Sequence, residues 1–549
     1  MFVSVRRRGR CRRPPAPYTF ALFGNCPEKD SCFQSPMKTD KELYHELRVL
    51  SCGRLWNDEV ARFDRSTPEE RIKRVAVIRA VGTVLSESGT AKQKAEVRSW
   101  LVRLLQDPSE KVRRYAMTAL PKIGAGPVEE EALLSLLRTT AIEREKKFLG
   151  QALDKIGGTA TLSVVGGVRG FLPQTEQKVK ASVARRERPS VIRMDSTLSD
   201  FTRLRIHLHC RKGLEKIVRD EVKEYIAKHG KFRVVEVRSR LVAITPVAPF
   251  SLADIYTLRC FATVGFFLGT VRSSDPAESA DALASLITSS LSRSVLATFT
   301  EGSIRYRLEF VSKGHQRGAV RLVANRAYAM CPDILNDPRS APWSMDLHPT
   351  GDGISVELRP KLTPDPRFTY REDDIRAASH PPLAACMARL GRSGNHEIVW
   401  DPFCGSGLEL IERALLGGVE CIYGTDLSPD AIAISRANFA AAQVKAVQSK
   451  FVCCDFRDYA KVEGLGPKSV TLVVTNPPMG KRIRVPNLRG LFGDLFAVAA
   501  EVLKPGGRLV FANPLRIEPL DPSLKLQYRQ VIDLGGFDCR LEMYLKRAR

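Results

Sequence analysis

The sequence predicts a multidomain protein whose three folded regions differ in class. Its 549 residues exceed what one compact core usually covers, and 44% hydrophobic and 27% charged residues are typical of folded chains. Apolar residues recur with helical spacing over 40–160, strand and helix signals mix over 203–375, and short buried strands alternate with helices over 376–549. We therefore expect α-helical repeats, then an α+β domain, then an α/β doubly wound sheet.

The charge balance indicates a polyanionic partner. Lys and Arg total 86 against 61 Asp and Glu, which gives a net charge of +25. Residues 378–549 hold 22 basic and 17 acidic side chains, or +5, so the remaining +20 lies upstream. RNA or DNA fits best and an anionic membrane surface comes second, with a generally basic compartment as the alternative. No apolar run reaches the roughly 18 residues of a membrane span, which argues against an integral membrane protein.

Residues 1–37 form a basic tail. Arginines and prolines precede the first acid, Glu28: Arg6, Arg7, Arg8, Arg10, Arg12, Arg13, Pro14, Pro15 and Pro17. An arginine-rich, acid-free start is typical of organellar transit peptides, so we favour a chloroplast or mitochondrion. The alternatives are a basic signal for the nucleus, or translation that starts at Met37.

The 13 cysteines show no disulfide framework, because their number is odd and no C-x-x-C pair occurs. We expect reduced thiols, most of them small core residues. A zinc site from Cys11, Cys26 and Cys32 is disfavoured by their irregular spacing, so no metal is expected.

Residues 40–160 contain a repeated motif. Ala119-Leu-Pro-Lys-Ile-Gly124 recurs as Ala152-Leu-Asp-Lys-Ile-Gly157, and Val77-Ile-Arg-Ala-Val-Gly82 is a looser echo. Each glycine is expected at a helix end, where glycine enters the left-handed cap without cost. The segment that opens at Asp107-Pro108 resembles HEAT repeats, which implies a small solenoid that docks a partner. An isolated helical bundle is the alternative, and residues 161–202 are expected to be a linker.

Residues 203–375 predict an α+β domain. We expect strands at 204–210, 232–245, 303–311 and 318–324, and an amphipathic helix at 213–229. The run Lys212-Gly-Leu-Glu-Lys-Ile-Val-Arg-Asp-Glu-Val222 resembles the first helix of THUMP domains, which implies binding to the ends of structured RNA. Five basic residues are candidate phosphate contacts, with a solvated strand face as the alternative: Arg305, Arg307, Lys313, Arg317 and Arg321.

Residues 376–549 predict the doubly wound sheet. Strands are expected at 397–401, 421–425, 450–454, 470–475 and 508–512, and helices from 408 and over 430–442. Four strands lead into a polar residue: Asp401, Asp426, Asp455 and Asn476. Doubly wound sheets bind ligands at the carboxyl ends of their strands, so this edge is the candidate active site. In Pro402-Phe-Cys-Gly-Ser-Gly407 the glycines are expected to let free backbone N–H groups approach a ligand at a helix N-terminus.

The ordered set resembles class I S-adenosylmethionine-dependent methyltransferases, which implies a Rossmann-like domain with S-adenosyl-L-methionine as cofactor. By this resemblance Asp426 binds the ribose hydroxyls, Asp455 and Phe456 address the adenine, and one loop holds the methionine part: Asp401, Phe403, Cys404, Gly405, Ser406 and Gly407. A dinucleotide site is weaker, because Leu410 stands where G-x-G-x-x-G needs its third glycine. Strand-end capping is the alternative role of the acids.

The turn Asn476-Pro477-Pro478-Met479 indicates amine methylation. The prolines fix the backbone, and the Asn476 side-chain oxygen with the Pro477 carbonyl can accept from one amine and orient its lone pair. In the family that the motif resembles, the acceptor is guanine N2, adenine N6, cytosine N4 or a glutamine amide. The fourth residue there is usually aromatic and stacks on the base, whereas Met479 offers less area, which leaves rate, base and even activity open.

Taken together, the two halves resemble THUMP-type RNA guanine-N2 methyltransferases, with 366–385 as the entry to the catalytic domain. The resemblance implies a tRNA or rRNA substrate, a further protein partner at the helical repeats and no membrane. Lys481, Arg482 and Arg484 are candidate phosphate contacts, with a solvated loop as the alternative. Two other functions stay open: methylation of another amine, including a protein amide, and a catalytically silent RNA-binding factor in ribosome or tRNA maturation.

Overall fold

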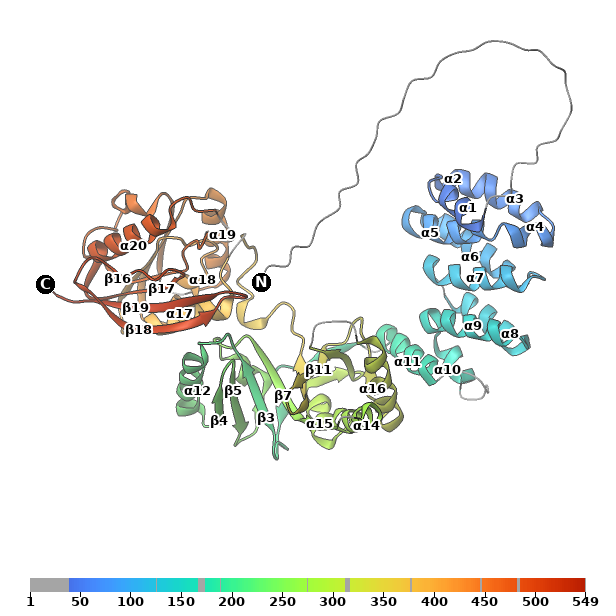
Figure 1. Ribbon diagram of the computed structural model, residues 1–549, viewed down its shortest axis with the longest axis horizontal. Helices are drawn as coiled ribbons and strands as arrows, with labels where there is room; N and C mark the ends of the chain where they lie inside the picture. The colour runs from blue at the N-terminus through green and yellow to red at the C-terminus, as the bar shows by residue number, and fades with distance from the viewer. Residues whose placement is uncertain are drawn as a thin grey trace, which may run out of the picture.

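The computed structural model describes residues 39–124, 126–165, 173–187, 189–273, 275–311, 316–375, 378–444, 447–480 and 484–548. A stack of helices, blue to cyan in Figure 1, extends from a green region built on one sheet, and a second sheet region in orange and red follows. The basic tail 1–37 and the residues Lys313, Lys481 and Arg482 lie outside the described residues.

The amino-terminal region is helical throughout. Threonine capping boxes open three of its helices, at Thr39, Thr67 and Thr90, because each threonine is followed three positions later by Glu or Gln. Its own core is separate from that of the sheet regions. The helices are α1 (Asp40–Leu47), α2 (Cys52–Arg54), the π-helical η1 (Leu55–Val60), α3 (Ala61–Arg65), α4 (Pro68–Lys73), α5 (Ala76–Ser88), α6 (Ala91–Leu104), α7 (Glu110–Ile123), α8 (Pro127–Thr139), α9 (Glu143–Ile156), α10 (Thr159–Val165) and α11 (Pro173–Glu187).

The repeated glycines do not share one role. Gly124 follows α7 with φ +87° and ψ 148°, so it ends the helix in a conformation that favours glycine but is not the expected left-handed cap. Gly157 follows α9 with φ −57°, so it is not in the left-handed region. Gly82 lies inside α5, where an added Cβ would stand 2.8 Å from the Cβ of Ala119 on α7. The expected helix end at Gly82 is therefore wrong, because this glycine serves the close approach of two helices.

The expected linker at 161–202 is also wrong in part, because α11 is a packed helix. Its buried side chains include Val179, Ala181, Val183 and Ala184. Arg185 donates to Asp337 at 2.6 Å, which ties the helix to the middle region. The many basic residues of this segment make its apolar face hard to recognise in the sequence. That face attaches the helical stack to the first sheet.

The middle region is built on an eight-stranded sheet of order β10-β9-β11-β12-β7-β3-β5-β4. The strands are β1 (Ser190–Ile192), β2 (Thr197–Leu198), β3 (Arg205–His209), β4 (Phe232–Arg238), β5 (Leu241–Pro246), β6 (Phe250–Ser251), β7 (Thr263–Val271), β8 (Thr300–Gly302), β9 (Arg305–Phe310), β10 (Leu335–Asn336), β11 (Trp343–Thr350) and β12 (Gly353–Pro360). The helices are α12 (Glu215–His229), α13 (Leu252–Tyr256), α14 (Pro276–Ile287), α15 (Ser290–Phe299), α16 (Arg317–Met330) and the short η2 (Pro366–Phe368).

The strand expected at 318–324 is wrong, since these residues belong to α16. Val323, Ala324, Ala327 and Tyr328 are buried, which is a helical spacing that runs past the end of the seven-residue window. Within the described residues no single helix has the length and apolar character of a membrane span, although α14 and α15, bent by 43°, reach both measures as a pair.

The carboxyl-terminal region is the expected doubly wound sheet, of order β15-β14-β13-β16-β17-β19-β18. The first five strands pair in parallel, and β19 pairs antiparallel with both β17 and β18. The elements are α17 (Pro381–Gly391), β13 (Glu397–Asp401), α18 (Leu408–Leu415), β14 (Val419–Asp426), α19 (Pro429–Ala441), β15 (Gln448–Cys453), η3 (Phe456–Lys461), β16 (Val470–Thr475), α20 (Leu488–Val502), β17 (Leu503–Asn513), β18 (Leu524–Asp533) and β19 (Asp538–Lys546).

Buried charge joins the two sheet regions. Arg259 of the middle region forms two hydrogen bonds with Glu412 on α18, at 2.8 and 2.7 Å. The Tyr370 hydroxyl donates to the same carboxylate at 2.6 Å. On the other side of the contact, Arg389 of α17 pairs with Glu221 and Glu224 of α12. One continuous apolar cluster also runs through both regions.

Candidate active site

The expected polar residues meet at one edge of the second sheet. β14, β13 and β16 are neighbours, and their carboxyl ends bring Asp426, Asp401 and Asn476 to the same side. Asp455 follows the next strand out, β15. The topology thus brings together side chains that follow four separate strands.

The glycine loop after β13 is held tightly. Gly405 has φ +53° and Gly407 φ +82°, so both adopt a conformation that favours glycine, and a Cβ on Gly407 would stand 3.2 Å from Ser435. The expectation of free N–H groups is wrong for most of this loop. The N–H of Phe403 donates to Asp401, that of Cys404 to the Thr425 carbonyl, that of Gly405 to Asp426 and that of Gly407 to the Cys404 carbonyl.

Asp426 therefore has a structural role besides any contact with a ligand. One carboxylate oxygen accepts from the Gly405 N–H at 3.0 Å, and the other accepts from the Ser428 N–H at 2.9 Å at the start of α19. Asp455 accepts from the Arg457 N–H and forms an ion pair with the Arg457 guanidinium. The Phe456 ring is buried against Phe403 at 4.9 Å, which leaves the Asp455 carboxylate as the more accessible group.

Two carboxyl groups are buried beneath the loop. Asp401 is fully buried, and its Oδ2 atom has no hydrogen-bond partner among the described residues. Burial raises the pKa of Asp401 well above its usual range, and the nearby Glu409 on α18 adds to the rise. Burial also raises the pKa of Glu409. Burial thus favours the neutral form of this pair, and a cation beside it would stabilise the ionised form.

The Asn476 side chain is oriented by residues that the sequence analysis did not select. Its amide nitrogen donates to the Ser379 hydroxyl at 2.8 Å, and that hydroxyl donates to Glu409. The Asn476 Oδ1 atom is buried and has no partner among the described residues. Pro477 is buried, while Pro478 and Met479 are half-buried beside it. The amide is therefore fixed with its acceptor unused, as an amine-binding group requires.

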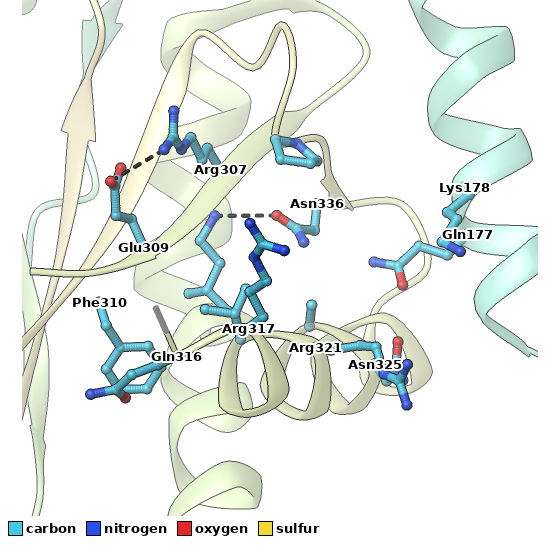
Figure 2. A pocket seen from close by; sticks show the side chains of 14 residues that line it. Gln177, Lys178, Arg307, Glu309, Phe310, Gln316, Arg317, Arg321, Asn325 and Asn336 are labelled. Atoms are coloured by element: carbon cyan, nitrogen blue, oxygen red, sulfur yellow. Dashed lines mark hydrogen bonds and ion pairs between the residues drawn. The ribbon is translucent and has the colours of Figure 1, made fainter. Parts of the chain in front are cut away.

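A second polar site lies on the middle region. A cavity of about 380 Å³ opens between β9, α16 and α11, and its cationic lining residues are Lys178, Arg307, Arg317 and Arg321. Figure 2 shows Arg317 and Arg321 on α16, Arg307 on the strand beside them and Lys178 on a separate helix. Glu309 pairs with Arg307 at 3.2 Å, whereas Arg317 and Arg321 have no acidic partner in the described part of the chain.

Arg305 does not belong to this site. It is 4% exposed and donates to Asp337 at 3.1 Å and to Ser340 at 3.0 Å, so its expected phosphate contact is wrong. Arg305 and Arg307 lie two positions apart on β9 and so share one face of the sheet. They differ in their partners, because the buried Asp337 and Ser340 take up the Arg305 guanidinium. Arg484 is an exposed loop residue of the catalytic domain.

Comparison with known proteins gives the class. Residues 369–521 match the family described as RMKL-like, methyltransferase domain. The probable tRNA (guanine(10)-N2)-dimethyltransferase of Methanothermococcus thermolithotrophicus is 30% identical over 153 residues, which cover 27% of this chain and 90% of that protein. The carboxyl-terminal region is accordingly a class I S-adenosylmethionine-dependent methyltransferase domain. The chain belongs to the RMKL-like methyltransferase family.

Two further similarities define the extent of the match. The tRNA (guanine(10)-N2)-dimethyltransferase of Methanocaldococcus jannaschii is 33% identical over 162 residues, which are 28% of this chain. The chain spans only 43% of the length of that relative. The crystal structure of TrmN from Thermus thermophilus superposes with a TM-score of 0.50 at 21% identity, covering 62% of this chain and 99% of that one, which shows a shared fold.

Proposed function

We propose that the protein is an RNA methyltransferase that transfers a methyl group to guanine N2 of a tRNA or rRNA. The observation that carries this proposal is the Asn476 amide, whose nitrogen is tied to Ser379 while its buried oxygen is unused. The names of the two archaeal relatives, both tRNA (guanine(10)-N2)-dimethyltransferases, support guanine N2 as the acceptor.

The residues present fit S-adenosylmethionine, because the orphaned acceptors at Asp401 and Asn476 need a cationic ligand and an amine. When bound, the cofactor supplies a methyl group on a positively charged sulfur. The loop from Asp401 to Gly407 would hold its methionine part, Asp426 would bind the ribose and Asp455 would contact the adenine. Asn476 Oδ1 and the Pro477 carbonyl would accept the two hydrogens of the base amine and so fix the direction of its lone pair. The nitrogen would gain the methyl group as the bond of that group to sulfur breaks, and the amine would then lose one proton. Most of the rate then comes from position and exclusion of water.

The middle region is proposed as a THUMP-like RNA-binding domain. The lining arginines of its cavity, Arg307, Arg317 and Arg321, provide cations that phosphates can neutralise. The net charge upstream of the catalytic domain supports this division, since +20 of the total +25 lies before residue 378. Met479 packs against the acceptor base in place of an aromatic ring.

The same site favours one second acceptor, an amine of a protein. The ribosomal protein L11 methyltransferase of Geobacter metallireducens is 28% identical over 180 residues, covering 32% of this chain and 53% of that protein. Either acceptor would present a nitrogen atom to the Asn476 turn, so the turn alone does not distinguish RNA from protein. The basic cavity of the middle region does distinguish them. An RNA substrate requires those cations, whereas a protein substrate does not.

One experiment tests the proposal. The purified full chain is incubated with isotope-labelled cofactor and either total RNA or ribosomal proteins from cells that lack the protein. We expect label in N2-methylguanosine when the RNA is digested and its nucleosides are measured by mass spectrometry. Label in protein alone, or label in RNA at another atom, contradicts the proposal. Asn476→Ala is the comparison variant, and it should lower the rate of labelling by about 10²–10³-fold.

Two further parts of the proposal concern the amino-terminal half. We propose that the helical stack is a HEAT-like docking surface for a protein partner, and that the tail 1–37 directs the chain to an organelle. Six arginines, with no acid before Glu28, support the second point. Imaging of the chain with and without residues 1–37 tests it, because removal of a transit peptide leaves the protein outside the organelle.

A further inference from the structure

Three ionisable side chains meet on one face of the middle sheet, in a different region of the chain from the methyltransferase turn. His207 and His209 stand two positions apart on β3 and share a face. The His207 Nδ1 atom lies 2.7 Å from one oxygen of Glu357 on β12, and the His209 Nε2 atom lies 2.7 Å from the other. All the ligand atoms of the three residues lie within 4.8 Å of one another.

The backbone is arranged to allow this contact. β7 lies between β3 and β12, so the Glu357 side chain must cross it. Gly265 of β7 is the partner of His207 in the ladder, and a Cβ there would stand 2.4 Å from a Glu357 oxygen. Any other residue would therefore obstruct the carboxylate. Glu357 has only 7% of its side chain exposed, so a buried acid is held under two imidazoles.

A fourth side chain completes the set. His348 on β11 places its Nε2 atom 3.9 Å from a Glu357 oxygen, and its ring stacks on that of His209 at 6.2 Å. His209 and His348 each have 32% of the side chain exposed, which leaves an approach from solvent. On the inner side, the His207 ring stacks on Phe267 at 5.0 Å and is thereby fixed.

We propose that His207, His209, His348 and Glu357 bind a zinc ion that clamps β3, β11 and β12. Three imidazole nitrogens and one carboxylate oxygen are ligands that Zn²⁺ accepts in tetrahedral geometry, at about 2.0–2.2 Å each. In the structure two of the imidazoles contact the carboxylate directly, and a zinc ion would replace these contacts with bonds to the metal. Because β3 and β12 are about 150 positions apart in the chain, as the sequence separation of His207 and Glu357 shows, the clamp closes a long loop. The ion holds the sheet, and the proposal is independent of the methylation chemistry.

The experiment uses the full chain, stripped with a chelator and dialysed against Zn²⁺. We expect one retained equivalent of zinc by elemental analysis, and a melting temperature that rises with zinc. His209→Ala and Glu357→Gln should each lower the zinc affinity by at least about tenfold. His396→Ala is the matched control, because His396 is 87% exposed and lies in the catalytic domain, so it should bind zinc as the parent does.

Substitution with Co²⁺ separates this site from the cysteines. Ligand-field bands of tetrahedral Co²⁺ without a thiolate charge-transfer band support the proposal, and a thiolate band overturns it. It is likewise overturned if the full chain retains no zinc, or if His209→Ala and His348→Ala keep the same equivalent. The four residues are then a hydrogen-bonded cluster only. The two histidines are half-exposed, so these variants decide the question even if Glu357→Gln fails to fold.

Discussion

The methyltransferase turn and the basic cavity of the middle region differ in what they leave unsatisfied. At the methyltransferase site, the buried oxygens Asp401 Oδ2 and Asn476 Oδ1 have no hydrogen-bond partner among the described residues. In the cavity, Arg317 and Arg321 are exposed and have no acidic partner within the same described part of the chain. A buried polar atom without a hydrogen-bond partner lowers the stability of the fold and accepts a ligand in one geometry only. An exposed cation costs little and attracts phosphate from many directions. The first arrangement suits orientation at a reacting atom, and the second suits attraction.

The largest effect should come from Asn476→Ala. Loss of the oriented oxygen should lower kcat by about 10²–10³-fold, as one polar group at a reacting centre usually does, while cofactor affinity stays nearly constant. Single-turnover kinetics and calorimetry with the cofactor measure the two quantities. A variant with full turnover on RNA would show that the amide does not position the substrate. Met479→Tyr is its companion, and it should keep or raise activity if Met479 substitutes for a stacking ring, since base stacking is worth about 1–3 kcal/mol.

Asp426→Ala should act on the cofactor. The substitution removes the proposed ribose contact and also the acceptor that holds the Gly405 N–H. We expect a loss of about 1–3 kcal/mol in binding free energy, measured by calorimetry. Asp430→Ala is a suitable control, because Asp430 lies four residues further along on α19 and is exposed. Equal affinity in parent and Asp426→Ala would remove Asp426 from the cofactor site.

Replacing Arg307, Arg317 and Arg321 with Ala should weaken RNA binding and leave kcat at saturating RNA unchanged. We expect the slope of log affinity against log salt to fall by about 0.7 for each single-strand phosphate contact that is lost. Filter binding at several salt concentrations measures the slope. Arg138→Ala is the control that should not change the slope, because Arg138 is an exposed arginine of α8 that pairs with Glu131, outside the middle region. A reduced kcat in the triple variant would mean that the cavity also orients the base.

The smallest effect is expected for Ser379→Ala. The Asn476 amide loses one neutral hydrogen bond, worth about 1 kcal/mol, so kcat should fall by about fivefold with little change in KM. Ser379→Thr keeps the hydroxyl and should restore most of the rate. If KM changes while kcat does not, Ser379 contributes to binding rather than to the orientation of Asn476.

The second sheet was predictable from the sequence because each of its strands is encoded by a short, continuous run of residues. Each strand is a short buried run, and each functional acid is the residue at which a run ends, as at Asp401 and Asp426. α16 was misread because seven residues cannot separate strand from helix, and the deciding residue Ala327 lies beyond them. The bond from Asn476 to Ser379 spans 97 residues and leaves no local pattern. The same holds for Arg305, whose partner Asp337 is supplied by another strand's loop.

The shared apolar cluster and the Arg259–Glu412 contact determine how the chain should melt. The middle and catalytic regions bury one continuous core between them, whereas the helical stack closes a core of its own. Scanning calorimetry should therefore show two unfolding transitions for the three regions. The two sheet regions should unfold together in one transition, and the helical stack in the other. A catalytic region without residues 1–377 would lose the Arg259 contact and expose Cys386 and Met387. Lower RNA methylation by this fragment would therefore reflect its lower stability as well as its lost RNA contacts.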